Sequence, residues 1–117
     1  MLRFWRATIN SRNGLAFAIR SEQAVREELV ALALAVPTAW LIGVTAMRKL
    51  ELVAVVALVL VVELLNTAIE KLADRLTTEH DTQIGRVKDM GSAAVGVSLM
   101  VAGLFWIFAI AERAGLI

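Results

Sequence analysis

Three long runs of apolar residues limit what this chain can fold into more than any other feature. Leu29 to Met47 contains 19 residues without a charge, and Met90 to Ala111 contains 22. Between them, Leu52 to Ile69 contains 18 residues with one charge, Glu63. About 20 apolar residues of helix cross the hydrocarbon core of a bilayer, and no alternation typical of a membrane barrel is present. We therefore predict an all-α membrane protein with three transmembrane helices, at 29–47, 52–71 and 90–111.

The composition agrees with a lipid environment. The chain has 117 residues, of which 59% are hydrophobic, and its mean hydropathy is +0.73. Soluble domains are about 45–50% apolar, and a small domain has too little interior to hide such an excess. The length predicts one domain, residues 1–117. The absence of cysteine excludes disulfides and thiolate metal sites, and a net charge of +1 gives no indication of nucleic-acid binding.

The first 28 residues mix aromatic side chains with arginines. Phe4, Trp5, Ile9 and Phe17 alternate with basic and small polar residues. This pattern predicts an interfacial amphipathic helix on the cytoplasmic leaflet, within residues 1–28, and a break near Asn13-Gly14. The residues from Arg20 to Glu28 are expected to form a second polar turn of helix leading into the first span. No cleavable signal peptide is expected, because five arginines and three glutamates precede the first apolar run.

The basic residues are unevenly distributed between the two sides of the predicted spans. Nine of the twelve lie before the first span or between the second and third, and three lie on the opposite side. Under the positive-inside rule, the N-terminus is cytoplasmic and the C-terminus is external. The nine are Arg3, Arg6, Arg12, Arg20, Arg26, Lys71, Arg75, Arg86 and Lys88, and the three are Arg48, Lys49 and Arg113.

A stripe of polar side chains enters the second span. Glu63, Asn66, Glu70 and Asp74 are spaced by offsets of 0, 3, 7 and 11, which places them on one face of a helix. An ionisable group inside a membrane indicates function by default. The depth of Glu63 suits it as a general base, which Asn66 can support by a hydrogen bond to its carboxylate or to a substrate hydroxyl. Glu70 lies near the aqueous surface, where Mg²⁺ can reach it. The alternative is that Glu63 pairs with a neighbouring helix and only helps assembly.

A second polar group precedes the third span. Lys88 and Asp89 lie on the side of the membrane where Glu70 emerges, so the lysine can meet nucleotide phosphates, or simply fix the topology by snorkelling. Small residues then follow at helix-packing spacings: Gly91, Ser92, Ala93 and Gly96. The chain has no glycine-rich phosphate loop and no zinc signature around His80, its one histidine. Any phosphoryl transfer must therefore use carboxylates, a bound metal and basic residues on helices.

Two of these segments together resemble a known family. The string Glu63-Leu64-Leu65-Asn66-Thr67-Ala68-Ile69-Glu70 is followed, eighteen residues after Glu70, by Lys88-Asp89-Met90-Gly91-Ser92-Ala93-Ala94-Val95. The pair is similar to the signature of the prokaryotic integral membrane diacylglycerol kinases, which include undecaprenol kinases. The resemblance implies a homotrimer with shared active sites. It also implies Mg²⁺- and ATP-dependent phosphorylation of diacylglycerol at the cytoplasmic face of the bacterial inner membrane.

The resemblance also implies roles for individual residues. Glu63 and Asn66 would be catalytic, and Glu22 and Glu70 would hold Mg²⁺. ATP would be bound by Arg3, Asn10, Glu22, Glu70, Glu79, His80, Asp81, Lys88 and Asp89. The lipid would be contacted by Arg3, Ser11, Arg12, Arg26, Glu28, Lys49, Glu63 and Ser92.

The sequence departs from the family pattern at Asn10 and His80, where an aromatic residue is usual. Two other interpretations are compatible with these residues. One is an undecaprenol kinase of the same family. The other is a non-enzymatic trimeric bundle that binds a cation or a lipid. Activity towards each lipid, offered separately, distinguishes the three.

Overall fold

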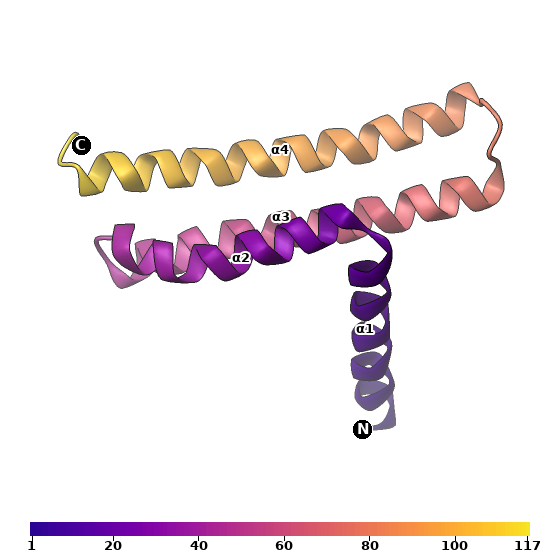
Figure 1. Ribbon diagram of the computed structural model, residues 1–117, viewed down its shortest axis with the longest axis horizontal. Helices are drawn as coiled ribbons and strands as arrows, with labels where there is room; N and C mark the ends of the chain where they lie inside the picture. The colour runs from indigo at the N-terminus through magenta and orange to yellow at the C-terminus, as the bar shows by residue number, and fades with distance from the viewer.

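The computed structural model describes all 117 residues as four α-helices and contains no strand. They are α1 (Leu2–Ser21), α2 (Gln23–Ile42), α3 (Ala46–Leu76) and α4 (Thr82–Arg113). In Figure 1, α2, α3 and α4 lie lengthwise along one another, whereas α1 leads away from them. The all-α fold predicted from the apolar runs is therefore confirmed.

The central helix is α3, which runs antiparallel to both of its neighbours. Near its beginning, Leu52 packs against Ala39 of α2 and Ala109 of α4. Near its other end, Asp74 pairs with Lys88, close to the start of α4. The connection between α3 and α4 therefore lies at one end of the layer, and the turn between α2 and α3 lies at the other, as Figure 1 shows.

The contacts between helices are made mainly by small side chains. Val55 and Val59 of α3 pack against Ala102 of α4 in a second cluster. Trp106 packs against both clusters, and its indole N–H donates a hydrogen bond of 3.2 Å to the carbonyl of Leu52. Small residues allow helix backbones to approach closely, which is how helices associate in lipid.

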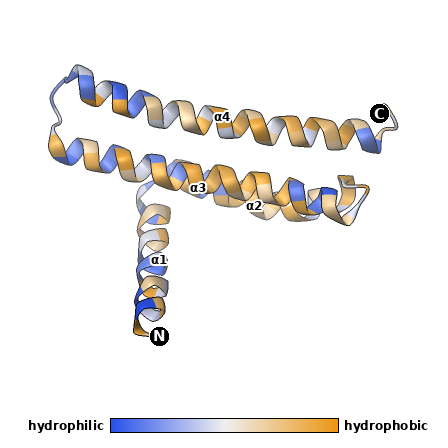
Figure 2. Ribbon diagram, turned by 180° about the vertical axis from the view of Figure 1, so that it is seen from behind, coloured by the Kyte–Doolittle hydropathy of each residue, from blue (hydrophilic) through white to orange (hydrophobic).

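One copy of the chain leaves most of its surface uncovered. Its radius of gyration is 17.3 Å, whereas a compact domain of this length would have about 13 Å. Only 15 of the 117 residues are buried. Figure 2 shows hydrophobic residues along the middle of α3 and α4 and hydrophilic ones near their connection. Both helices are long and apolar enough to cross a membrane.

The predicted break near Asn13-Gly14 is wrong, because α1 is one continuous helix. A glycine costs a helix only about 1 kcal/mol relative to alanine, and several alanines surround this one. The chain instead bends at Glu22, whose backbone is extended (φ −127°, ψ 118°). The expected continuous turn from Arg20 to Glu28 is therefore also wrong, since it contains the junction of α1 and α2.

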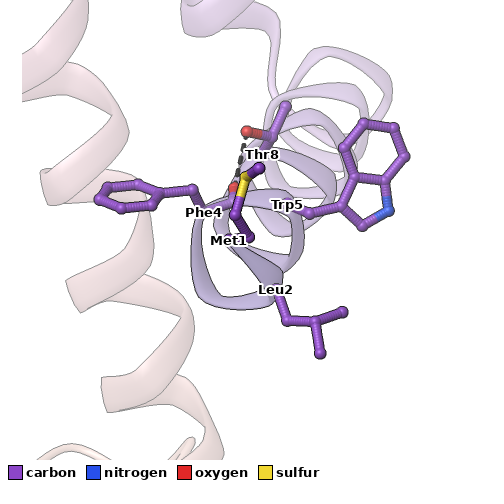
Figure 3. A pocket seen from close by; sticks show the side chains of 5 residues that line it. All are labelled: Met1, Leu2, Phe4, Trp5 and Thr8. Carbon is purple, nitrogen blue, oxygen red and sulfur yellow. Dashed lines mark hydrogen bonds between the residues drawn. The ribbon is translucent and has the colours of Figure 1, made fainter.

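The first turn of α1 carries large apolar side chains that are exposed. Leu2, Phe4 and Trp5 point in different directions around the helix, and with Met1 and Thr8 they line a shallow hollow of about 390 Å³ (Figure 3). The Thr8 hydroxyl donates to the Phe4 carbonyl at 2.9 Å, which keeps this polar group within the helix. Such a turn suits an interface between water and lipid.

The first apolar run does not form one helix from 29 to 47. α2 continues through Pro37 but ends at Ile42, and the next helix already begins at Ala46. The turn is stabilised by Thr45, whose hydroxyl accepts a hydrogen bond of 3.0 Å from the backbone N–H of Arg48. The C-terminal boundary predicted for this span is therefore wrong, because an uncharged stretch can contain a turn as well as a helix.

Candidate active site

The acidic side chains that the sequence groups on one stripe extend from the middle of α3, at Glu63, towards the α3–α4 connection. Glu63 is half-buried there and feels the negative charges of three carboxylates. Two of these, Glu28 and Glu22, come from the start of α2 and from the α1–α2 junction, and the third is Glu70 of α3. The bend at Glu22 thus brings residues far apart in sequence to one place.

Asn66 is the buried member of the stripe, with 7% of its surface exposed. Its amide nitrogen donates a hydrogen bond of 3.2 Å to a carboxylate oxygen of Glu70, one helical turn on. The expected support of Glu63 by Asn66 is not seen, because the amide is turned towards Glu70. Asn66 therefore orients the carboxylate predicted to bind metal.

Glu22 faces a residue that the sequence reasoning did not assign to the site. Its carboxylate forms an ion pair of 2.9 Å with the Lys71 ammonium, which also lies 5.1 Å from the centre of the Phe17 ring. Lys71 thus links α3 to α1 and to the α1–α2 junction. No sequence spacing could have revealed this contact, because it depends on the direction in which α1 leaves the bundle.

The Lys88 ammonium forms an ion pair of 2.5 Å with the carboxylate of Asp74. Both partners are partly exposed, so this pair is accessible to a charged ligand. Asp89 lies exposed beside it. Asp74, the last member of the stripe, is therefore the residue that holds Lys88.

The connection between α3 and α4 forms a polar cavity of about 360 Å³. Four of the residues expected to bind ATP line it together: Glu79, His80, Asp81 and Lys88. Asp81 also begins α4, where one of its carboxylate oxygens accepts hydrogen bonds from the backbone N–H groups of Gln83 and Ile84, at 2.9 and 3.0 Å. It therefore has a structural role as a helix cap, which its sequence position before the helix explains.

A larger and mainly apolar groove, of about 550 Å³, lies between α1 and α3. Ser11, Phe17, Leu64 and Lys71 are among its lining residues. Leu64 follows Glu63 in the sequence, and Lys71 is the partner of Glu22 in the ion pair. Ser11, one of the residues expected to contact lipid, is thus placed beside the candidate site.

Glu28 and Arg26 lie at the start of α2. Partial burial, followed by repulsion from Glu27, raises the pKa of the Glu28 carboxyl above its ordinary value. The Arg26 guanidinium donates to the backbone carbonyls of Ile19 and Arg20, at 2.7 and 3.2 Å. Arg26 thereby closes the end of α1, whereas Glu28 faces Glu63.

Several expected site residues are not brought to these carboxylates in one copy of the chain. Lys49 lies at the opposite end of α3, about 20 Å along the helix axis from Glu63, with its ammonium 4.6 Å from the Trp40 ring. Arg3, Asn10 and Arg12 are exposed on α1, and Ser92 is exposed on α4. Their expected roles remain predictions.

The carboxylates present are suitable for Mg²⁺. This cation usually binds one or two protein carboxylates and completes its shell with water and substrate phosphates. No three acidic or histidine side chains form a ready cluster, so a site of the fully protein-coordinated kind is not built. Glu70 and Glu22 supply the smaller donor set, and each is held by one donor of the chain itself.

Comparison with known proteins shows the family of the chain. Residues 9–110 match the family described as prokaryotic diacylglycerol kinase. The chain is 45% identical over 96 residues to the diacylglycerol kinase of Escherichia coli (strain K12), covering 82% of this chain and 79% of that protein. It is 36% identical over 100 residues to the diacylglycerol kinase of Haemophilus influenzae, covering 86% and 85%. It is 38% identical over 104 residues to that of Pseudomonas aeruginosa, covering 89% and 85%.

The matched segment includes α2, α3 and nearly all of α4, and with them the polar stripe, the α3–α4 connection and Lys88. A family of membrane kinases also explains why two helices are suited to cross a bilayer while acidic and basic groups gather near one of their ends. The chain is a bacterial membrane protein and belongs to the prokaryotic diacylglycerol kinase family.

Proposed function

We propose that the chain transfers the γ-phosphoryl group of ATP to the primary hydroxyl of diacylglycerol, giving phosphatidate and ADP. The observation that supports this best is the succession of three features along α3 towards the α3–α4 connection. They are the half-buried Glu63, the oriented Glu70 carboxylate and the polar cavity that contains Lys88. The relatives, which are diacylglycerol kinases, supply the lipid class.

In this reaction Glu63 acts as the general base. Its carboxylate accepts the proton of the lipid hydroxyl while the hydroxyl oxygen bonds to the γ-phosphorus, and the bond from that phosphorus to the ADP oxygen breaks. The position of Glu63 supports this role, because it lies next to lining residues of the apolar groove between α1 and α3. A lipid tail in that groove would bring its head group to the carboxylate.

Glu70 and Glu22 are the residues that would hold Mg²⁺. When bound, the ion neutralises charge on the ATP phosphates. Asn66 keeps the Glu70 carboxylate in place, and Lys71 holds Glu22 at the α1–α2 junction. These contacts leave both carboxylates on the same side of Glu63, which fits a transfer between a phosphate and a lipid hydroxyl.

Lys88 and the α3–α4 connection are proposed to bind the nucleotide. The ammonium of Lys88 is partly exposed and lines the polar cavity, so it is accessible to phosphate oxygens. Glu79 and His80 line the same cavity, where ribose or base atoms would be accepted. Asn10 and Arg3 would reach this nucleotide only through a different placement of α1 or from another copy.

The same proposal includes the assembly and the membrane layout. Three spanning helices, with α1 on the cytoplasmic leaflet, leave the N-terminus inside and the C-terminus outside the inner membrane. A homotrimer would cover part of the apolar surface that one copy exposes and would bring distant site residues together. This is how Ser92 and the polar face of α1 would approach a shared site, whereas Lys49 would stay at the external ends of the helices.

The test is phosphorylation in mixed micelles with diacylglycerol and undecaprenol offered separately, and with turnover expressed per assembled protein. We expect diacylglycerol to be phosphorylated, and Glu63→Gln to lower turnover by about 10²–10⁴-fold with MgATP affinity unchanged. Glu51→Gln is the matched control, since it makes the same substitution at the far end of α3. Turnover with undecaprenol alone would assign the chain to the other branch of the family. Near-normal turnover of Glu63→Gln would remove Glu63 as the base.

A shared site has its own test. Glu63→Gln and Lys88→Met are each expected to be inactive. Mixed assemblies of the two should regain partial activity if a base from one copy meets a lysine from another. No recovery in crosslinked mixed assemblies would contradict sharing.

A further inference from the structure

Asn66 of α3 and Gly91 of α4 lie against each other near the candidate site. Gly91 is buried, and a Cβ atom built on it would overlap the side-chain oxygen of Asn66. The other α4 glycines are different, because a Cβ on Gly85, Gly96 or Gly103 meets nothing within 4 Å. Of these four positions, only Gly91 is required to be glycine by a neighbouring side chain.

The chemistry of Glu70 determines which way the Asn66 amide points. An ionised carboxylate only accepts hydrogen bonds, so the NH₂ group must face Glu70. The amide oxygen then faces α4, where it is buried and has no hydrogen-bond partner. Burying an oxygen in this way is unfavourable, and it persists because the missing side chain of Gly91 leaves room for it.

We propose that Gly91 is a positioning residue that acts through Asn66 on Glu70. By admitting the amide oxygen against α4, it fixes the NH₂ group on the Glu70 carboxylate and so sets where that carboxylate lies. The consequence for activity rests on the proposed function, in which Glu70 holds Mg²⁺. It also makes Asn66 a donor in this site, since its oxygen is covered by α4.

A methyl group at this position would move the side chain of Asn66 in preference to the helix. The nearest atom to the added Cβ is the end of the Asn66 side chain, and the next is its Cγ at 3.2 Å. No backbone atom is among the three nearest atoms. We therefore expect Gly91→Ala to fold and assemble, with the amide rotated away from Glu70 and the bond to that carboxylate lost.

Selective labelling makes this rotation visible independently of activity. The chain has three asparagines, Asn10, Asn13 and Asn66, so protein labelled with ¹⁵N-asparagine gives three side-chain NH₂ signals. Asn66→Ala identifies the signal of interest, and Glu70→Gln shows how it responds when its acceptor changes. Gly91→Ala should shift that signal and leave the Asn10 and Asn13 signals in place. Gly96→Ala, in open space on the same helix, should shift none of them.

The functional measurement is turnover as a function of Mg²⁺ concentration. Displacing a catalytic carboxylate by about 1 Å is worth about 10²-fold, so we expect a loss of that order and a higher Mg²⁺ requirement in Gly91→Ala. Gly96→Ala should stay within about twofold of the parent. In an Asn66→Ala background, Gly91→Ala should cost less than about a further twofold, because the overlap is gone.

An unshifted Asn66 signal in folded Gly91→Ala would overturn the proposal. So would equal losses from Gly91→Ala with and without Asn66, since the effect would then be general helix packing. If Gly91→Ala alone does not assemble, Asn66→Ala is compared with the double variant that carries Asn66→Ala and Gly91→Ala. Failure of the parent protein to phosphorylate any lipid would instead contradict the proposed function. The NMR result would still decide whether Gly91 positions the Asn66 amide.

Discussion

Leu52→Ala tests both the packing of the layer and its lipid surroundings. Leu52 is 0% exposed and is enclosed by Ala39 and Ala109, which are also 0% exposed. Alanines have no rotamers with which to fill a space. The hydrogen bond from Trp106 to the Leu52 carbonyl also holds α3 and α4 at their present separation. The substitution should therefore leave a cavity that does not collapse.

The magnitude follows from the reference state. In soluble proteins, Leu→Ala in a core costs about 2–5 kcal/mol, which combines the loss of transfer free energy with a cavity term. The transfer part, about 0.8 kcal/mol for each of three carbons, disappears in a membrane, because the separated helix keeps Leu52 in lipid. The cavity part remains near its upper limit, so we expect a loss of about 2–3 kcal/mol.

The assay is reversible unfolding in mixed micelles, with Leu50→Ala as the matched control. Leu50 lies on the same helix but is 62% exposed, so its truncation should change the free energy of unfolding by less than about 0.5 kcal/mol. A loss below 1 kcal/mol for Leu52→Ala would refute the rigid contact between the three helices. A loss above 4 kcal/mol would refute the lipid reference state, since it would include the full transfer term.

Three further predictions concern other charged groups. The pKa of Glu28 is raised in the folded state, so folding disfavours the charged form of this carboxyl. Glu28→Gln should therefore be as stable as the parent at acid pH and more stable than the parent above the raised pKa. Unfolding curves measured across a pH series check this, and equal stability at every pH would contradict it. Lys71→Met should loosen α1, so that limited proteolysis cuts faster near the α1–α2 junction. Glu22→Gln should have the same effect, and the double variant should be cut no faster than either single variant. Arg48 forms an ion pair of 3.0 Å with Glu112 at the end of the bundle far from Glu70. Arg48→Met should therefore lower thermal stability and leave the Glu70-dependent affinity for Mg²⁺ unchanged. A changed Mg²⁺ titration would show that the two ends are coupled.

The helices were predictable where a single physical signal fixed them. Long, almost uncharged runs predicted α3 and α4, because a helix exposed to lipid requires such a run. The turn at Gly43–Thr45 was not predictable, since it interrupts an apolar run without a charge and depends on Thr45 as a helix cap. The bend at Glu22 was missed because the residues around it are equally compatible with helix, whereas the glycine that invited a break lies inside α1.

The candidate site divides in the same way. The stripe from Glu63 to Asp74 follows from the helical period within one element, and the structure preserves it. The partners of that stripe come from other elements, so the contacts of Lys71 with Glu22 and of Gly91 with Asn66 depend on helix register. A small residue at a packing position was recognised, but which side chain it makes room for was not.

The few buried residues have a consequence for handling the protein. A chain that buries 15 of 117 residues takes much of its cohesion from whatever amphiphile surrounds it. Detergent chain length, lipid content and the ratio of lipid to protein then act as components of the folded particle, in the way that ionic strength acts on a soluble enzyme. Two laboratories that purify identical protein into different micelles are, in energetic terms, comparing two different molecules.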